Sequence, residues 1–456
     1  MARHGQTASA DPRSDRSTAQ RRTRQPMARR ALILVEGHSG MGLQYVEAAR
    51  RLGVYPITLS ADPAQYDYLA AERIQAIQVD TDNFNSLIRE CSRLWETYTI
   101  AGITGFSRAD ELACVMAGKL CLHFGLPGPN PRAVEQCCDK YTQRQLLAAS
   151  GVPIPAYRLA ANTAEAEDAA REIGLPVIVK PAVGSGSAGV RLCRTADEVV
   201  EHTIHLLSGK PIGRSSKMLV EEFAQGPYYT AEIMGNEVVA IGTGDFACPP
   251  HFVCRGFTFP AALTHDEYNR IAGVSLSCLS ALGLGWGPTN VELRWTKRGP
   301  LVIEVNPRLA GTPFPQLVRL AYGVDLITEH INLLIGNDWD LRRKHSNIAA
   351  ARHLIADRDG TLDWVDGHSQ AVALSDVAEV KFYIEPKTPI VRNGDFRDCL
   401  GHVIAASSSL PRTEAILQRA VDLISWSITP FPTIDDENES AAPPGLSHRM
   451  SSDREL

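Results

Sequence analysis

The stretch Val177-Ile-Val-Lys-Pro-Ala-Val-Gly-Ser-Gly-Ser-Ala-Gly-Val190 decides the expected fold. Its apolar start predicts a strand that delivers Lys180 directly to a glycine-rich loop. Glycine lets backbone N–H groups converge on phosphate oxygens, because no Cβ stands in the way. A lysine beside such a loop supplies a point charge for the same oxygens. The segment therefore predicts a phosphate-binding loop, and a surface hairpin with a chance lysine is the alternative.

A second pair of predicted strands carries polar residues at alternating positions. Asn290 and Glu292 lie on one strand, and Glu304 and Asn306 lie on the next. Because strand side chains alternate between faces, each pair shares a face. Two carboxylates and an amide oxygen are hard ligands that suit Mg²⁺ when phosphates bind it too. An edge strand on which these groups face solvent is the alternative.

Outward from these motifs, the apolar pattern predicts three structured regions. Strands and helices alternate over about 29–130 and predict an open parallel α/β sheet. Its turn at Gly37, Gly40 and Gly42 has the spacing G-x-x-G-x-G, a weak match to a dinucleotide site. A mixed region over about 131–338 includes single helices expected at 130–150 and 315–334, and a small α/β unit is expected at 340–430.

Polar tails are expected at both ends of the chain. Residues 1–28 and 433–456 contain too few large apolar side chains to pack, and we expect them to be disordered. The first tail lacks the apolar core of a secretory signal. Translation can start at Met1 or at Met27, and the sequence leaves both starts open.

Composition excludes several classes of function. The net charge of −6 and the absence of a strongly basic region argue against nucleic acid as a partner. No apolar stretch approaches the roughly 20 residues that span a bilayer, so no membrane partner is expected. The ten cysteines are scattered and form no C-x-x-C pair, which favours reduced thiols and a cytoplasmic protein.

The ordered motifs now allow a comparison with a known family. Lys140, Lys180 with its glycine loop, Val220-Glu-Glu-Phe223, Asn290-Val-Glu292 and Glu304-Val-Asn306-Pro-Arg308 follow one another as in the ATP-grasp superfamily. Over about residues 31–430 the chain resembles the branch that holds biotin carboxylase and the L-amino-acid ligases that make dipeptides. This resemblance implies an α/β ATP-grasp fold, with an N-terminal open parallel α/β domain and a small C-terminal α/β cap.

The resemblance also implies a role for each motif. Lys140 and Lys180 would contact the phosphates of ATP, under a lid formed by Gly184, Ser185, Gly186, Ser187 and Gly189. The adenine edge would be bound by Glu221, Glu222, Phe223 and Ala224. Magnesium, or manganese as the alternative, would be held by Glu292, Glu304 and Asn306. Arg308 would hold the transferring phosphate or the acyl-phosphate, which makes Arg308 and Lys180 the expected catalytic residues.

The activity implied is an ATP-dependent carboxylate–amine ligase. It would form an amide or peptide bond through an acyl-phosphate and release ADP and phosphate. Such chemistry needs positioning and neutralisation of charge more than a dedicated nucleophile. The expected partners are a small carboxylate and a small amine, and family habit implies a homodimer. The alternatives are carboxylation of a small substrate, as in biotin carboxylase, and a non-catalytic ATP-binding regulatory subunit.

Two departures from the family pattern affect the substrates. Gly226-Pro227 is followed by Tyr228 where many members have a ribose-binding glutamate, and Glu232 is the nearby alternative. Dipeptide ligases often have a Glu and a His where this chain has Cys254 and Phe257.

Arg255 in the same segment suggests a pocket for an anionic or hydroxylated acid instead of a free ammonium. A small alignment shift, with His251 or His265 in the usual role, is the alternative. Gly311 would let the backbone approach a ligand, or is only a turn residue. Arg392, Arg397 and His402 could reach the site, although for each we expect a solvated face.

Overall fold

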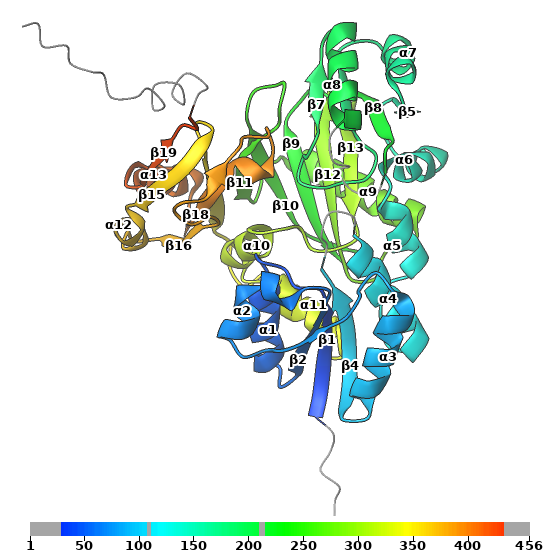
Figure 1. Cartoon of the computed structure of the whole chain (residues 1–456), viewed down its shortest axis with the longest axis vertical. Coiled ribbons are helices and arrows are strands. Elements are labelled where there is room, and N and C mark those ends of the chain that lie inside the picture. Colours follow the sequence, from blue (N-terminus) through cyan, green and yellow to red (C-terminus); the bar gives the residue numbers. More distant parts are fainter. Residues whose placement is uncertain (1–28, 107–110, 209–214, 433–456) are drawn as a thin grey trace, which may run out of the picture.

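The structure, a computed structural model, describes residues 29–106, 111–208 and 215–432. The expected tails 1–28 and 433–456 lie outside these residues. In Figure 1, an N-terminal group of elements lies below a central sheet, a small sheet with two helices lies above it, and a C-terminal group lies beside it. No helix in the described ranges is long and apolar enough to cross a membrane.

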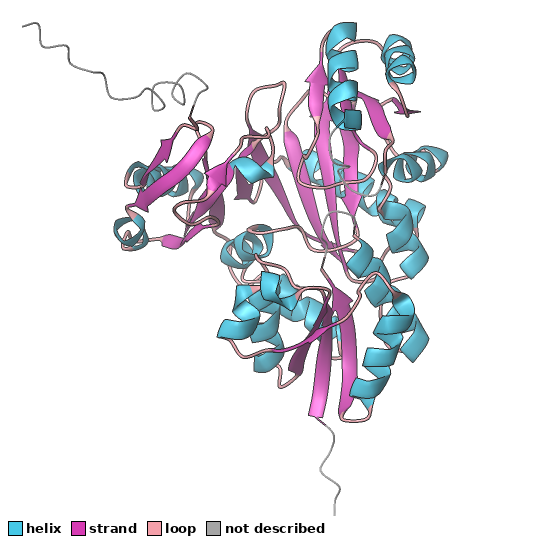
Figure 2. Ribbon diagram, in the orientation of Figure 1, coloured by secondary structure: helices cyan, strands magenta, loops and turns pink. Residues whose placement is uncertain are grey.

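The N-terminal sheet is parallel throughout and has the order β3-β2-β1-β4. Helices cover both of its faces (Figure 2), so residues 31–35 are fully buried and read as a continuous apolar run. The predicted open parallel α/β sheet is therefore confirmed. Its elements are β1 (Arg29–Val35), α1 (Gly42–Arg51), β2 (Tyr55–Ser60), α2 (Asp67–Ala71), β3 (Gln75–Gln78), α3 (Phe84–Trp95), β4 (Tyr98–Gly105) and α4 (Leu112–Phe124).

The central sheet of the described chain is antiparallel and has the order β13-β12-β9-β10-β11-β14-β18-β16. Its last three strands come from the C-terminal region, which therefore continues this sheet. α9 (His265–Leu282) packs against its first strands. The strands are β9 (Tyr228–Met234), β10 (Glu237–Phe246), β11 (Cys254–Phe259), β12 (Pro288–Thr296), β13 (Gly299–Asn306), β14 (Ile348–Ile355), β16 (Val377–Phe382) and β18 (Cys399–Ser407).

Two smaller sheets complete the described structure. The upper one has the order β5-β8-β6-β7 and consists of β5 (Tyr157–Ala160), β6 (Val177–Pro181), β7 (Arg191–Cys193) and β8 (Met218–Glu222), with α7 (Thr163–Ile173) and α8 (Ala196–Ser208). The glycine loop joins β6 to β7. The C-terminal one has the order β17-β15-β19 and consists of β15 (Gly360–Asp366), β17 (Pro389–Ile390) and β19 (Ser425–Thr429), beside α12 (His368–Val372) and α13 (Leu410–Asp422).

Each of the two long helices expected from the sequence is interrupted. Residues 130–150 form α5 (Pro131–Cys137) and α6 (Lys140–Ala149), because the Asp139 carboxylate caps the second helix by accepting the Thr142 N–H at 2.7 Å. Residues 315–334 likewise form α10 (Phe314–Tyr322) and α11 (Leu326–Leu334), separated at Gly323. The first break places Lys140 at the first residue of α6.

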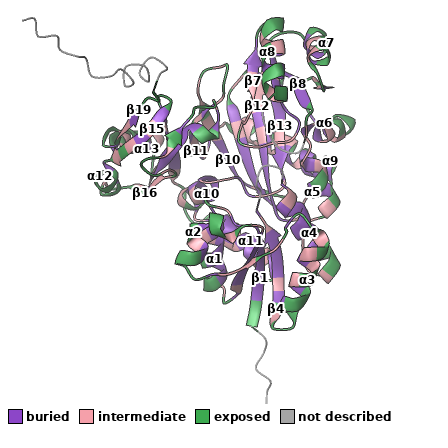
Figure 3. Cartoon of the chain, viewed as in Figure 1, coloured by how far each residue is buried: buried purple, intermediate pink, exposed green. Residues whose placement is uncertain are grey.

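Burial follows the layers of the fold. Figure 3 shows buried strands inside and exposed outer faces on the helices. One apolar cluster joins α1 of the N-terminal group to α10, α11 and the central sheet, through residues such as Val46, Leu317 and Ile331. This shared core fixes the N-terminal group against the central sheet, and the cavity described next opens where they meet.

Candidate active site

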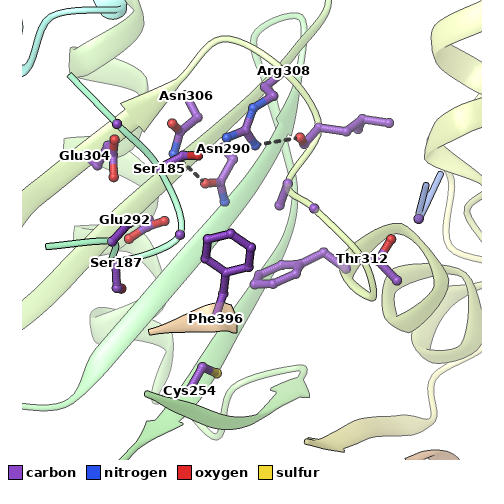
Figure 4. A pocket seen from close by; sticks show the side chains of 18 of the residues that line it. Ser185, Ser187, Cys254, Asn290, Glu292, Glu304, Asn306, Arg308, Thr312 and Phe396 are labelled. Atoms are coloured by element: carbon purple, nitrogen blue, oxygen red, sulfur yellow. Dashed lines mark hydrogen bonds between the residues drawn. The ribbon is translucent and has the colours of Figure 1, made fainter. Parts of the chain in front are cut away.

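A cavity of about 910 Å³ lies where the groups of elements meet. It brings together most of the residues that the sequence singled out: Lys140, Lys180, Gly184, Ser185, Gly186, Ser187, Glu221, Glu222, Phe223, Ala224, Glu292, Glu304, Asn306, Arg308 and Gly311. Figure 4 shows Glu292 and Glu304 close to the glycine loop with Ser185 and Ser187. Gly189, His251 and Arg255 are outside the cavity lining.

The two predicted acidic residues face each other across a strand pair. Glu292 on β12 is opposite Glu304 on β13, and Asn290 is opposite Asn306 in the same register. The Asn306 amide donates to Asn290 Oδ1 at 3.2 Å, and Asn290 in turn donates to Glu232 at 2.8 Å. This chain of hydrogen bonds fixes the orientation of the Asn306 amide.

The electrostatics of the acidic pair suit a bound cation. Burial and the neighbouring Glu304 carboxylate raise the pKa of Glu292 to about 7. Burial also acts to raise the pKa of Glu304, but the Lys140 ammonium at 2.8 Å outweighs it and lowers that pKa. Two like charges at close range are costly without a cation between them. Within the described residues no group of three or more His, Cys, Asp or Glu could hold a metal ion by itself.

Two buried lysines line the same end of the cavity as the acidic pair. Lys140 begins α6, and its ammonium donates to the Gly184 carbonyl at 2.5 Å as well as to Glu304. Lys180 at the end of β6 makes an ion pair with Glu221 at 2.5 Å. Burial lowers the pKa of Lys180, although Glu221 acts to raise it. Both ammonium groups therefore lie beside the carboxylates and the glycine loop, as the sequence predicted.

The Glu221 side chain is committed to the protein interior. Its carboxylate accepts from Arg144 at 2.6 Å and from Lys180, and both Glu221 and Arg144 are buried. Burial alone would raise the pKa of Glu221, but the two cations outweigh it and lower that pKa. The carboxylate is therefore paired with Lys180 and Arg144 inside the protein, although Glu221 lines the cavity together with residues 222–224. Nothing in the sequence marked Arg144 as a site residue, because it lies within an ordinary helix.

The glycine loop has the backbone that its composition predicted. Gly186 and Gly189 have φ values of +67° and +71°, and Ser187 shares this left-handed region at +61°. Gly186 also contacts the C-terminal region, since a Cβ there would lie 2.4 Å from the Phe396 ring. The Gly189 carbonyl bonds to His202 of α8 at 2.9 Å, outside the cavity lining. The loop is thus held from both sides.

Arg308 has a partner that sequence reasoning missed. Its Nε lies 2.8 and 3.0 Å from the two carboxylate oxygens of Glu111, and its Nη1 donates to the Leu309 carbonyl at 3.0 Å. Its Nη2 makes no hydrogen bond within the described residues, at a position that lines the cavity. Glu111 precedes α4, nearly two hundred residues from Arg308, so no local pattern revealed the pair.

The structure does not bring the other two expected substrate residues to the cavity. Arg255 is exposed in a β-bulge, where Asp245 pairs with Gly256 and Phe246 pairs with Cys254. The exposed His251 packs against Gly394. The cavity is lined instead by Cys254 and Phe257, and by Gly311, where an added Cβ would meet no described protein atom within 4 Å. The exposed alternative, His265, begins α9 outside the lining.

Of the two residues considered for the ribose contact, only one reaches the cavity. Tyr228 lines it, whereas Glu232 is buried outside its lining and accepts the Asn290 amide. Burial raises the pKa of Glu232 to about 7. The Arg294 guanidinium lies 5.6 Å from the centre of the Tyr228 ring and donates to the Gly226 carbonyl at 3.0 Å. Tyr228 and Arg294 thus form one wall of the cavity next to residues 221–224.

Several lining residues had no sequence signal or were expected elsewhere. The turn with His38 and Gly40 lines the cavity, and Glu36 anchors it by accepting from Ser60 at 2.8 Å and from Thr81 at 2.5 Å. The C-terminal region contributes Lys381, Phe396 and Arg397, of which Arg397 is exposed, as expected, and also reaches the cavity lining. His402 is fully buried against Tyr383, which corrects its expected exposure. Arg392 is exposed, as expected.

Two family models match the chain. The first is described as an ATP-grasp domain and matches residues 173–316. The second is described as L-amino acid ligase C-terminal domain 2 and matches residues 352–429. Together they cover the glycine loop, both carboxylate strands and the strands that carry Lys381 and His402.

Curated relatives and solved structures agree with these matches. The uncharacterized protein y4rH of Sinorhizobium fredii is 56% identical over 412 residues, which are 90% of this chain and 86% of that protein. Human carnosine synthase 1 is 28% identical over 75% of this chain, which spans only 43% of that protein.

Among solved structures, the L-amino acid ligase of Bacillus licheniformis has a TM-score of 0.74 at 19% identity, covering 89% of this chain and all of that one. The biotin carboxylase of Campylobacter jejuni has a TM-score of 0.66 at 18% identity, over 87% of this chain and 92% of that one.

Proposed function

The chain belongs to the ATP-grasp family of ligases that form C–N bonds, and we propose that it joins a small carboxylic acid to an amine through an acyl-phosphate. A carboxylate oxygen attacks the γ-phosphorus of ATP, which forms the acyl-phosphate and releases ADP. The amine nitrogen then attacks the acyl carbon. The C–O bond to phosphate breaks, the nitrogen loses a proton, and an amide and inorganic phosphate remain.

The divalent metal that this family uses fits the acidic pair. Glu292, Glu304 and Asn306 would hold it, and Mg²⁺ suits this all-oxygen set, with Mn²⁺ as the alternative. The fit rests on the geometry, because the two carboxylates face each other in register on adjacent strands and the Asn306 amide is held next to them. When bound, the metal would neutralise part of the charge of the phosphates.

The residues of the chain position the reactants. Lys140 and Lys180 would contact the phosphates, and Arg308, held by Glu111, would stabilise charge on the transferring phosphoryl group. The glycine loop from Gly184 to Gly189 would cover the site and keep water from the acyl-phosphate. We assign the adenine edge to the backbone of residues 222–224 and the ribose contact to Tyr228.

The observation that carries this proposal is the opposed pair Glu292 and Glu304 beside Lys140. The pair lies in register on adjacent strands, and Lys140 connects it to the glycine loop. A metal-bound triphosphate needs donors and cations in this arrangement. A regulatory subunit without turnover has no need to keep all of them.

The test is ATP-dependent hydroxamate formation by the full chain. A panel of acids is incubated with ATP, Mg²⁺ and hydroxylamine, and hydroxamate, ADP and phosphate are measured. Glu304→Gln should lower kcat by about 100-fold or more, because it removes a carboxylate that would hold the charge-neutralising metal. Glu237→Gln, the same change at an exposed position of the central sheet, should leave kcat unchanged.

Each alternative predicts a different result. A regulatory subunit predicts no hydroxamate and no effect of Glu304→Gln on the activity of its complex. A carboxylase predicts ADP release that depends on bicarbonate and biotin instead of on an acid from the panel. Biotin carboxylase is a likeness of fold at 18% identity, so we favour the amide-forming ligase.

Three further expectations accompany this function. We propose a division into an N-terminal α/β domain at 29–130, an ATP-grasp core at 131–338 and a C-terminal cap at 340–430. We also propose a homodimer, which sedimentation of the purified chain tests. A cytoplasmic location is proposed from the reduced, scattered cysteines.

A further inference from the structure

The cations that line the cavity differ in whether the protein already satisfies them. Lys140, Lys180, Arg308 and Arg397 each make an ion pair, with Glu304, Glu221, Glu111 and Asp395 respectively. Arg294 donates to a backbone carbonyl and lies over the Tyr228 ring. Lys381 lines the same cavity, and its ammonium makes no ion pair, side-chain hydrogen bond or ring contact with any residue in the described ranges.

Lys381 stands at the end of the cavity near the N-terminal turn. It comes from β16, the edge strand of the central sheet, and is only partly exposed. Burial first, and then the charges of Arg308 and Lys381, lower the pKa of His38 to about 4. His38 is therefore uncharged at neutral pH and lies within the electrostatic reach of both cations. We call this end, lined by His38, Arg308, Thr312 and Lys381, the acyl end.

An unsatisfied hydroxyl lies in the same place. The Thr312 Oγ1 atom is buried without a hydrogen-bond partner in the described structure, and Thr312 lines the cavity. It lies against the N-terminal turn, because a Cβ on Gly40 would come within 2.2 Å of that oxygen. Buried hydroxyls are normally bonded, so an unpaired one in a cavity is available to a ligand atom.

Among the residues that the structure describes, the acyl end has no acidic side chain available for an ammonium group. The carboxylates from the described ranges that line the cavity all belong to the opposite end or to its wall, and they are Glu221, Glu222, Glu292 and Glu304. Glu111 is held by Arg308 and is not part of the lining. Glu379, two residues before Lys381, is also outside the lining and bonds to His402 at 3.3 Å. Cys254 and Phe257 offer no negative charge.

We propose that the acid activated by this enzyme is a dicarboxylate without a free ammonium group, and that Lys381 binds its second carboxylate. This inference rests on the proposed ligase reaction and adds the class of its acid. Arg308 would serve the carboxylate that receives the phosphoryl group, and the Thr312 hydroxyl would donate to the substrate between the two cations. An unpaired ammonium in a cavity of low dielectric strongly favours an anion and disfavours another cation.

The experiment uses three acids of equal carbon number with different far ends. Butanedioate, butanoate and 4-aminobutanoate carry an anionic, a neutral and a cationic end, and pentanedioate and its two counterparts extend the series. Hydroxylamine replaces the natural amine, so the assay reports only on the acid. The measurement is kcat/KM for hydroxamate formation by the full chain with ATP and Mg²⁺.

The wild-type chain should prefer the dianions within each set. Lys381→Gln should lower kcat/KM for the preferred dianion by about 10- to 100-fold, as expected for a lost hydrogen bond between charged groups. It should change butanoate little, and Lys381→Arg should keep the preference. Lys381→Glu should shift the preference toward 4-aminobutanoate, which a merely structural role would not do. Lys387→Gln, an exposed lysine of the same region, is the matched control.

The outcomes separate this inference from the ligase reaction. Hydroxamate from neutral or cationic acids but not from the dianions would overturn the inference and leave the reaction standing. The same holds if Lys381→Gln keeps the wild-type preference, since Lys381 would then serve the amine substrate or the fold. ADP and hydroxamate from none of the acids would overturn the ligase reaction and this inference with it.

Discussion

At the end of the cavity that holds the glycine loop, Lys140, Lys180 and Glu304 each have a partner inside the protein, whereas Lys381 at the acyl end has none within the described residues. The first end is assembled before any ligand arrives, from motifs on regular strands and a helix terminus. The acyl end is assembled from an N-terminal turn, the segment after β13 and the strand β16. The residues that we assign to ATP were indicated by local sequence patterns, while those that we assign to the acid come together only in the tertiary fold.

The largest effect is expected at Arg144, which supports the pre-assembled end. Arg144→Met leaves Glu221 and Lys180 buried without their third charge, and breaking such a buried network costs about 3–5 kcal/mol. Chemical denaturation of the full chain measures the loss. Arg171→Met on the exposed face of α7 is the control, and equal stability of both variants would mean that this end is not pre-assembled.

A substitution of Glu111 tests whether Arg308 serves the transferring phosphate or only the binding of the nucleotide. Glu111→Gln removes the charge that holds the guanidinium, and kcat should fall by about 10- to 100-fold, the range for a hydrogen bond between charged groups. KM for ATP should stay close to the wild-type value, because Glu111 is outside the cavity lining. A large rise in that KM with unchanged kcat would assign Arg308 to nucleotide binding instead.

The acidic pair should make metal binding depend on pH. In the metal-free protein Glu292 titrates at about 7, so between its unfolded pKa and that value the folded state holds an extra proton. Stability without metal therefore falls as pH rises through this window, and the metal relieves that cost. The increase in Tm given by Mg²⁺ and ADP should be larger at about pH 8 than at about pH 6, because protons compete for ligands. Glu292→Gln should abolish this difference, and its persistence in that variant would exclude Glu292 as the titrating ligand.

The smallest effect is expected at Phe396, where the C-terminal region contacts the glycine loop. Phe396→Ala removes one aromatic contact with Gly186, and KM for ATP should rise by about two- to fivefold. The free energy of unfolding should stay unchanged, because the ring is more than half exposed. Steady-state kinetics and denaturation measure the two quantities, and a large loss of stability would make Phe396 part of the core.

The sequence predicted the motif-bearing end well for a physical reason. Lys180, the glycine loop and the alternating polar residues of β12 and β13 depend on local backbone rules, such as the two-residue period of a strand. The same rules failed at residues 130–150, where the cap at Asp139 outweighed the apolar period and divided the helix. The resemblance gave Glu221 a role at the adenine edge, and no local pattern indicated its buried pairing with Arg144.

Contacts between distant segments set the limit of sequence reasoning at the acyl end. Nothing local indicated that Glu111 holds Arg308, or that Lys381 reaches the turn at His38. Arg255 looked like a substrate residue because its position in the segment fitted, but a bulge turns it outward. A bulge changes which side chains face a cavity, and no residue type in this segment indicated that a bulge would form.

The central sheet runs without interruption from the strands of Glu292 and Glu304 to the strand of Lys381. A hydrogen-bonded sheet resists hinge motion, so we expect the distance between the acidic pair and Lys381 to stay constant. The four-stranded sheet with the glycine loop is a separate sheet, and we expect it to be the part that moves for nucleotide exchange. ATP would then enter when the four-stranded sheet moves. The central sheet would stay fixed and so would limit the length of the acid that fits.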